Sequence, residues 1–312
     1  MSPKTNFAYY SKYSRKIRRN VKIKRDLFIL ALMIIPVLNY LVFFVYVNAR
    51  SIAMAFQMTT SQGTIWTFDN FTRFFREVQI PELDISVAIK NNFLLFIEGT
   101  VIGTPLCLLL SYFLYKRIKG YRIFRVIFFL PSIISGVVLV GLYKNIFATN
   151  GPVNEILSII FQRQISIEWM VDDNITMYCI LFFCLWSGFG GGMILYTGAM
   201  NRIPKDVLEY AKLDGCSSFR ELVQIIIPMI WPTLSTQLLF SISGIFVASG
   251  PILLFTKGQF KTMTLGYFIL EQVEGGSYEY PSAIGLFFTL VSIPIVLITR
   301  KIFNSTIEDI QY

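Results

Sequence analysis

Long apolar runs alternate with short polar connections along most of this chain. Six runs reach the length of about 20 residues that a helix needs to cross the hydrocarbon core of a membrane. They lie near residues 27–49, 91–115, 124–147, 176–200, 226–254 and 281–303. The first run is too long for the apolar region of a signal peptide, so it is also predicted to be a span. The pattern predicts an all-α, polytopic membrane protein whose transmembrane domain covers residues 27–303.

The composition agrees with a membrane protein. Hydrophobic residues make up 54% of the 312 residues and charged residues only 15%, whereas a soluble domain carries about 25% charged residues. The chain contains no histidine, which removes the usual proton shuttle and the commonest metal ligand. Its four cysteines form no Cys-x-x-Cys pair, so they are interpreted as small apolar residues and no metal site is predicted.

Basic residues are distributed unevenly between the connections. Of the 28 Lys and Arg residues, 20 lie in the N-terminal segment, the second-to-third connection, the fourth-to-fifth connection and the segment after the last run. The positive-inside rule therefore places both termini in the cytoplasm, as a basic tail (1–26) and a short C-terminal tail (304–312). Since topology accounts for this asymmetry, the net charge of +9 predicts no nucleic-acid partner.

The fourth-to-fifth connection, which the same rule makes cytoplasmic, has the pattern of two short helices. It reads NRIPKDVLEYAKLDGCSSFRELVQIIIPMIWPTL. Pro204 suits the first turn of a helix over about 204–215, and Gly215 suits a left-handed cap at its end. Ser218 and Glu221 have the spacing of a capping box that starts a second helix. Pro228 then marks the return into the membrane.

The first of these helices has a small apolar face beside a charged edge. Val207 and Ala211 share a face at a spacing of four residues, and Glu209, Lys212 and Asp214 form the edge. Small and charged residues together indicate a docking surface, because alanine lets another backbone approach and an acid supplies a polar anchor. The alternative is a solvated connecting loop.

The same residues resemble a known motif. Glu209-Tyr210-Ala211, Gly215 and Ile225-x-Ile227-Pro228 are similar to E-A-A-x(3)-G-x(9)-I-x-L-P, the EAA motif of permease subunits of ATP-binding-cassette importers. Tyr210 and Ile227 depart from that pattern. The segments 69–75, 130–157 and 185–215 also resemble carbohydrate and glycerol-phosphate permeases of the maltose-system type, so the likeness covers most of the transmembrane domain.

This resemblance implies a function and a set of partners. In that family the cytoplasmic helix is a coupling helix that docks on an ATPase subunit. The chain is expected to form half of a sugar path in a bacterial cell membrane, together with a second permease chain of different sequence, an ATPase dimer and an extracytoplasmic solute-binding protein. The coupling role would fall to Glu209, Ala211, Asp214, Gly215 and Pro228.

The chain lacks the residues that chemistry on ATP or on a sugar would need. The phosphate-binding pattern G-x-x-x-x-G-K-[ST] does not occur in the sequence, so ATP and Mg²⁺ are expected to be bound by the partner ATPase. Without histidine, a Ser/His/Asp triad cannot form. We therefore expect a transport subunit with no cofactor of its own, and not an enzyme.

Polar and aromatic residues at the depth of the spans are candidates for the substrate path. Trp186, Phe189 and Tyr196 offer aromatic faces and a hydroxyl that suit a sugar, and the neighbouring glycines leave helix packing as an equal alternative. Ser243 belongs to a small polar stripe for which helix packing is the favoured interpretation. Glu98 is a charge well inside a run, and such charges are costly there unless they are used. The favoured alternative to direct substrate binding is that Glu98 pairs with a polar neighbour in the bundle or with the second permease.

Other functions remain as alternatives. A permease of the same class for a glycerol-phosphate-type or other polar solute is the first of them. Such an anionic solute would favour Arg or Lys at the centre of a run, and none occurs there. A membrane-embedded enzyme lacks its catalytic residues here, and a stand-alone secondary transporter would show an internal repeat that this sequence lacks.

Overall fold

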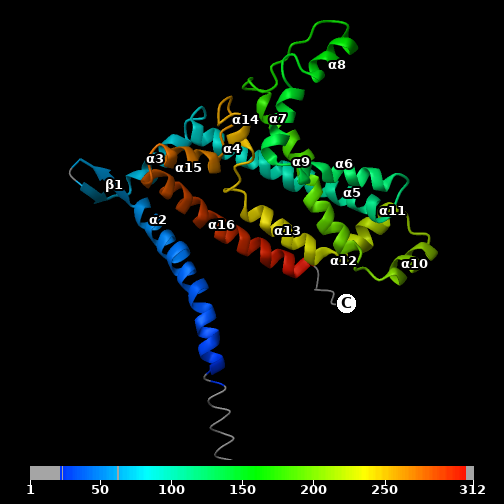
Figure 1. Ribbon diagram of the computed structural model, residues 1–312, viewed down its shortest axis with the longest axis horizontal. Coiled ribbons are helices and arrows are strands. Elements are labelled where there is room, and N and C mark those ends of the chain that lie inside the picture. Colours follow the sequence, from blue (N-terminus) through cyan, green and yellow to red (C-terminus); the bar gives the residue numbers. More distant parts are fainter. Residues whose placement is uncertain (1–21, 23, 62, 307–312) are drawn as a thin grey trace, which may run out of the picture.

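The protein is a bundle of apolar helices, and the computed structural model describes residues 22, 24–61 and 63–306 (Figure 1). The unbroken helices that are long and apolar enough to cross a membrane are Lys24–Ala55, Asp84–Tyr115, Thr176–Met200 and Glu279–Ser305. Two bent helix pairs, counted as one span each, bring the described spans to six. The predicted all-α membrane fold is confirmed. The predicted tails, 1–26 and 304–312, lie largely outside the described residues.

The elements follow one another along the chain with short connections. In order, they are η1 (Tyr40–Tyr46), α2 (Val47–Ala55), β1 (Gln57–Thr60), β2 (Gly63–Trp66), α3 (Asp69–Val78), α4 (Asp84–Phe96), η2 (Ile97–Gly103), α5 (Thr104–Tyr115), α6 (Tyr121–Ile133), α7 (Gly136–Ile146), α8 (Pro152–Phe161), α9 (Thr176–Met200), α10 (Lys205–Leu213), α11 (Ser218–Arg220), η3 (Glu221–Ile226), α12 (Ile227–Met229), α13 (Trp231–Ser243), α14 (Ile252–Phe255), α15 (Leu265–Glu274) and α16 (Glu279–Thr306). The η elements are π-helices, and α4, η2 and α5 form one continuous second span.

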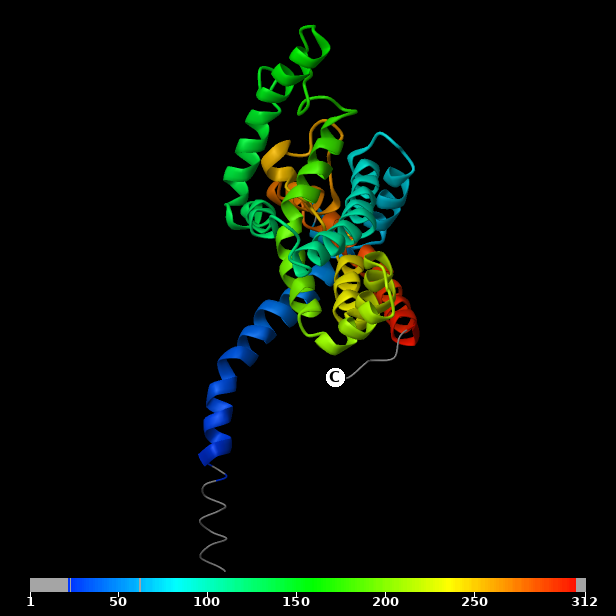
Figure 2. The same ribbon diagram turned by 90° about the vertical axis from the view of Figure 1, so that its right-hand side faces the viewer.

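The first span stands apart from the other helices for most of its length (Figures 1 and 2). None of its most apolar window is buried against the rest of the chain. It joins the bundle at its C-terminal end, where α2 lies against α16. There the β1–β2 hairpin follows, and the Thr59 hydroxyl donates a 2.7 Å hydrogen bond to the Glu279 carboxylate of α16. A helix that is apolar on every side suits a lipid environment.

The third span is broken into α6 and α7, which meet at an angle of 109°. Pro131 lies in the last turn of α6 and has no N–H to donate to the helix. Ile134 and Ser135 then adopt extended backbone conformations, with ψ values of 142° and 132°. The apolar run predicted as one span over 124–147 is therefore two helices.

The fifth span differs from its prediction at both ends. It begins at Ser218, bends by 77° between Met229 and Trp231, and ends at Ser243, whereas the apolar run indicated 226–254. The bend lies at Ile230, between Pro228 and Pro232.

Side-chain hydrogen bonds explain why the helix can stop early within an apolar run. The amide of Asn92 in α4 donates to the backbone carbonyls of Ile245 and Ala248 at 2.9 and 3.0 Å. These bonds satisfy carbonyls that the unwound chain after Ser243 no longer pairs within a helix.

Two apolar cores hold the bundle together. One joins residues of α3, α4, α7, α9, α14, α15 and α16, and the other joins residues of α5, α9, α10, η3 and α13. Only α9 among these elements contributes to both cores in the described part of the chain. Helix α9 thus connects the end of the bundle that carries α10 with the opposite end, which carries α14 and α15 (Figure 1).

Glycines bring α9 close to its neighbours at two positions. A Cβ atom at Gly192 would lie 2.7 Å from the Cys107 sulfur of α5, and one at Gly190 would lie 2.5 Å from the Ser132 hydroxyl of α6. A Cβ atom at Gly191 would meet no atom within 4 Å. The close packing of α9 on α5 and α6 therefore requires glycine at 190 and 192 but not at 191.

We expect Gly192→Ala to lower the thermal midpoint of the purified protein in detergent. The added methyl group must displace Cys107, and overpacking of this kind costs about 1–3 kcal/mol. Gly191→Ala is the matched control, and it should leave the midpoint unchanged or raise it, because alanine is the better helix former by about 1 kcal/mol. Equal midpoints for the two variants would contradict the close approach of α9 and α5.

Candidate functional site

A cavity of about 390 Å³ lies between the second span, α9 and α13. Its walls are largely apolar or glycine, and seven side chains with oxygen or amide groups also line it, those of Asn92, Glu98, Thr100, Thr104, Tyr196, Gln237 and Ser241. Ligand sites are typically apolar cavities with a few convergent polar groups. The cavity therefore has the character of a binding site for a solute that carries hydrogen-bonding groups.

Glu98 is the sole charged residue among those that line this cavity. It lies in the π-helix η2 and is 9% exposed. Short π-helical segments inside α-helices are frequent at functional sites. A carboxylate in this position accepts hydrogen bonds from hydroxyl or amino groups and repels anions.

The structure brings together three of the five predicted path residues. Glu98, Phe189 and Tyr196 all line the cavity, whereas Trp186 and Ser243 do not. The Trp186 ring packs edge-on against Phe183, with centroids 6.1 Å apart. A spacing of three residues leaves Trp186 and Phe189 about 60° apart around the helix axis, so they face different neighbours.

Ser243 belongs to another surface. Its hydroxyl donates to the Leu239 carbonyl at 2.7 Å, within its own helix. It lines a second, more apolar cavity of about 730 Å³ between α13 and α16. Ser243 is exposed there, so its helix-packing interpretation stays a prediction.

Sequence reasoning missed the polar wall contributed by Gln237, Thr100 and Thr104. The signal for Gln237 was present, because it is the one side-chain amide in the apolar segment 231–247, and such groups are costly in a membrane unless they are used. The two threonines carried no comparable signal, since threonine hydroxyls can bond within a helix. Thr104 does so, donating to the Gly99 carbonyl at 3.2 Å.

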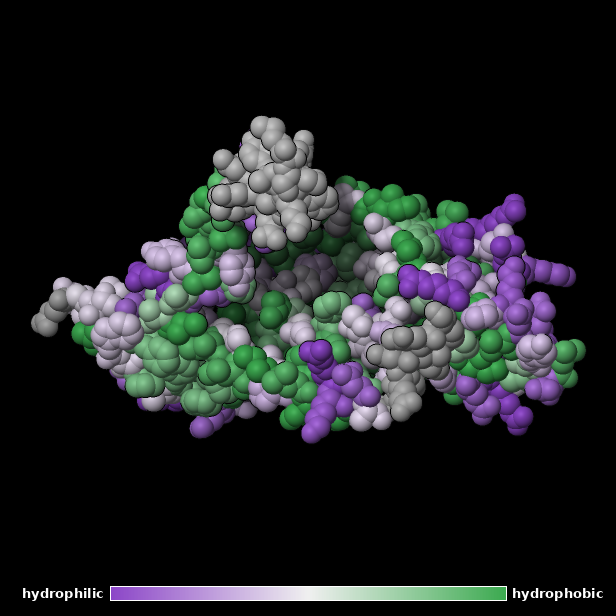
Figure 3. Space-filling view, turned by 90° about the horizontal axis from the view of Figure 1, so that it is seen from below, coloured by the Kyte–Doolittle hydropathy of each residue, from purple (hydrophilic) through white to green (hydrophobic). Residues whose placement is uncertain are grey.

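The short helix α10 presents charged and large apolar side chains to the surroundings. Leu208 and Ala211 are buried against the chain itself, while Glu209, Tyr210 and Leu213 are exposed. Figure 3 shows hydrophilic residues gathered at the end of the molecule where α10 and α11 lie. The expectation that Ala211 faces a partner is therefore corrected. The outward surface consists of charged residues of both signs, Glu209 and Lys212 among them, with the large side chains of Tyr210 and Leu213.

The cap of α10 agrees with the sequence pattern, and the start of α11 does not. Gly215 has φ of +72°, the left-handed conformation that was expected at the end of α10. Asp214, the exposed C-cap residue of α10, lies directly before it. Ser217, and not Ser218, caps α11, because its hydroxyl accepts from the backbone N–H of Arg220. The predicted capping box between Ser218 and Glu221 is therefore not formed, and Glu221 makes an ion pair with Lys116.

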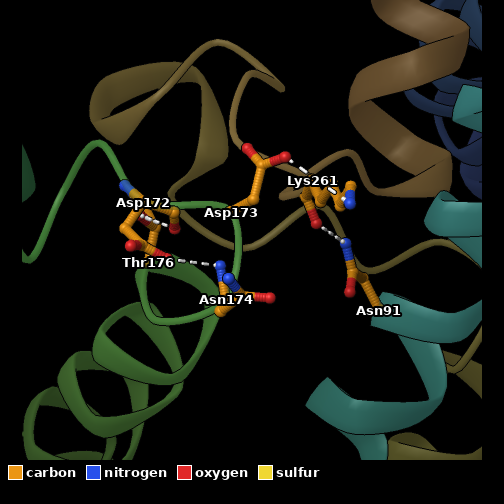
Figure 4. Close-up of polar contacts among 6 residues, drawn as sticks. All are labelled: Asn91, Asp172, Asp173, Asn174, Thr176 and Lys261. Carbon is orange, nitrogen blue, oxygen red and sulfur yellow. Dashed lines mark hydrogen bonds and ion pairs between the residues drawn. The ribbon is translucent and has the colours of Figure 1, made fainter.

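At the opposite end of the bundle, polar contacts fix the loop between α14 and α15 (Figure 4). The Asn91 amide of α4 donates to the carbonyls of Lys261 and Met263 at 2.9 and 2.7 Å. The Lys261 ammonium lies 3.5 Å from the Asp173 carboxylate, which belongs to the turn before α9. These contacts connect the loop after the fifth span to the second and fourth spans.

The turn before α9 is itself held by local hydrogen bonds. Thr176 and Asp172 exchange two bonds of 3.0 and 2.7 Å through the threonine hydroxyl, and the Asp172 carboxylate accepts from the backbone N–H of Asn174 at 2.7 Å. Such a turn positions Asp173 for Lys261 (Figure 4). No group of three or more His, Cys, Asp or Glu side chains able to hold a metal occurs in the part of the chain that the structure describes.

Residues 99–305 match the protein family described as "Binding-protein-dependent transport system inner membrane component". That match covers α10, all spans after the second and most of the residues that line the cavity, and it begins directly after Glu98. The chain therefore belongs to this family of membrane permease subunits of binding-protein-dependent transport systems. Family membership confirms the prediction of a multi-pass permease subunit that is not itself an enzyme.

Two relatives illustrate the extent of the similarity. The probable ABC transporter permease protein YesP of Bacillus subtilis (strain 168) is 27% identical over 173 residues, which is 55% of each chain. The lactose transport system permease protein LacF of Rhizobium radiobacter is 26% identical over 242 residues, or 76% of each chain.

Solved structures of a bacterial alginate transporter have the same fold. One, described as an ABC transporter involved in the import of the acidic polysaccharide alginate, contains a chain with a TM-score of 0.79 and 24% identity; it covers 93% of this chain and 99% of that one. A second, in complex with a periplasmic protein bound to an alginate pentasaccharide, has a TM-score of 0.76 and 25% identity, over 89% and 94% of the two chains.

Proposed function

We propose that this chain forms half of the translocation path of an ATP-driven importer for a sugar or oligosaccharide. The observation that carries the proposal is the cavity between the second span, α9 and α13. Amide, hydroxyl and carboxylate groups on its walls suit the hydroxyl groups of a sugar, and Phe189 offers an aromatic face for its C–H surface. LacF, a relative named for lactose transport, and the alginate importer support a saccharide as cargo.

The exposed face of α10 supports a docked ATPase. Glu209 supplies an acidic anchor, and Tyr210 and Leu213, which are 69% and 82% exposed, offer apolar surface beside it. In this proposal the ATPase dimer binds ATP and Mg²⁺, closes, and moves α10. Gly215 and Pro228 then mark the points at which the connection and the fifth span turn.

The remaining partners are a second permease chain and a binding protein. The apolar first span, which is not buried against the rest of the chain, leaves apolar surface that a second permease would cover while it completes the path. The family description names a binding protein, and the alginate importer is seen with one. The face that carries α14 and α15 lies opposite α10, so we propose that it receives the binding protein outside the cell membrane, with α10 in the cytoplasm.

We expect the tagged chain, isolated from native membranes in mild detergent, to retain three other proteins. They are an ATPase with a phosphate-binding loop, a second permease and a solute-binding protein, all identifiable by mass spectrometry. The captured binding protein should bind a neutral sugar in a calorimetric screen against sugars, uronates and glycerol phosphodiesters. Isolation of this chain alone, under conditions that keep a known importer intact, would overturn the proposal in favour of a stand-alone transporter.

A further inference from the structure

A buried ion pair joins two spans at the α10 end of the bundle. Glu221, the first residue of η3, is 3% exposed, and its carboxylate contacts the ammonium of Lys116, which is 24% exposed. The ammonium also lies 5.6 Å from the centre of the Tyr112 ring. The other ion pairs of the described residues have carboxylates that are at least 20% exposed. Among the ion pairs of the described residues, only the one between Lys116 and Glu221 therefore contains a buried carboxylate.

The two partners belong to elements with different tasks. Lys116 directly follows α5 at the end of the second span, and that span contributes Glu98, Thr100 and Thr104 to the cavity. Glu221 follows α10 and α11 and begins the segment that leads into α13. The ion pair therefore connects the wall of the cavity to the segment that carries the outward face of α10.

Apolar packing alone would connect these elements less specifically. Tyr112 of α5 and Leu222 and Ile226 of η3 belong to the same core, but apolar contact is non-directional and lets helices slide past one another. A buried charge has few alternative partners, and an unpaired one is strongly unfavourable. A displacement of Glu221 that keeps the pair intact must therefore carry Lys116, and the end of the second span, with it.

We propose that Lys116 and Glu221 are positioning residues that transmit the movement of α10 to the second span, so that the cavity wall bearing Glu98 follows the ATPase. This inference rests on the proposed function, because it requires an ATPase docked on α10. The pair acts through the position of the second span and touches neither solute nor nucleotide.

A native thiol allows the movement to be measured without knowledge of the solute. Cys184 lines the cavity from α9, so its rate of modification by 2-sulfonatoethyl methanethiosulfonate reports how accessible the cavity is. The experiment uses the complete complex isolated with this chain, with Cys107, Cys179 and Cys216 replaced by serine. Rates are compared without nucleotide and after trapping with ATP and vanadate, and ATP hydrolysis is measured in parallel.

We expect the rate in the parent complex to change severalfold on trapping, and Lys116→Met or Glu221→Gln to abolish most of that change while ATP hydrolysis continues. Lys119→Met is the matched control, since Lys119 is exposed in the same connection, and it should respond as the parent does. The double exchange Lys116→Glu with Glu221→Lys should restore the response, because the pair is re-formed with reversed charges.

The outcomes separate the inference from the proposed function. A full response in the single variants overturns the inference, and so does failure of the double exchange to restore a lost response. If a single variant does not assemble with the ATPase, the double exchange gives the answer. A double-exchange complex that assembles and responds as the parent does supports the role of the ion pair, and a double-exchange complex that does not assemble or respond overturns it. Absence of any ATPase from the parent complex instead overturns the proposed function.

Discussion

Asn92→Ala is expected to destabilise the folded protein strongly. The Asn92 side chain is 1% exposed, and its amide and carbonyl oxygen make three hydrogen bonds to the backbone, with Ile245, Ala248 and Leu265, at 2.9 to 3.0 Å. Alanine would leave these buried backbone groups without that partner. Each unsatisfied group costs about 1–3 kcal/mol, so the loss should reach about 3 kcal/mol or more.

Size-exclusion chromatography after stepwise heating measures this effect. For a loss of that size we expect the thermal midpoint to fall by about 5–10 °C. Asn174→Ala removes the same atoms from an exposed position and should leave the midpoint nearly unchanged. If both variants have the same thermal midpoint as the parent protein, the irregular backbone after α13 does not depend on Asn92.

Gly215→Val is expected to reduce transport by about tenfold or more while the protein still inserts and folds. Gly215 has φ of +72°, and a Cβ atom there would meet nothing within 4 Å. The effect therefore arises from the backbone, since a β-branched residue is a clear outlier in the left-handed region and strain of this kind costs about 1–3 kcal/mol. The chain relieves the strain by rotating out of this conformation, which redirects α10 relative to α11.

Two further variants isolate that cause. Gly215→Asn should transport at close to the parent rate, because asparagine tolerates left-handed φ values. Gly276→Val introduces valine at φ of +82°, again with open space around its Cβ atom, but after α15 at the opposite end. Uptake of the sugar that the captured binding protein binds, measured in proteoliposomes, should fall for Gly215→Val and persist for Gly276→Val. Equal uptake by these two variants would contradict the proposal that the conformation of Gly215 orients α10 for transport.

The local features of the molecule were readable from the sequence. Apolar runs of sufficient length predicted the spans, because a backbone in lipid must satisfy its own hydrogen bonds and a helix does so locally. The left-handed conformation of Gly215 followed from its place after a short helix, and the burial of Glu98 followed from its place in an apolar run. Each of these depends on neighbours along the chain.

The breaks in the third and fifth spans were only partly readable. Pro131, Pro228 and Pro232 signal a possible interruption, but proline is tolerated in membrane helices when neighbours satisfy the freed backbone groups. The early end at Ser243 depends on Asn92, which lies far away in the sequence and supplies the hydrogen bonds that the unwound segment requires.

The direction in which each side chain faces was decided by the tertiary structure. Phe189 and Tyr196 line the cavity while Trp186 packs on Phe183, although all three share one apolar helix. Ala211 turns inward, because the core that contains Leu208 lies on that side of α10.

The sequence by itself determined the apolar spans, the short helix α10 with its glycine cap, and the position of Glu98 inside a span. Helix periodicity also determines which residues share a face. It does not state what each face meets. The pairing of Glu221 with Lys116, and the assembly of the cavity from three spans, depend on which helices are adjacent. That adjacency results from packing between segments distant in the chain, so only the tertiary structure decided it.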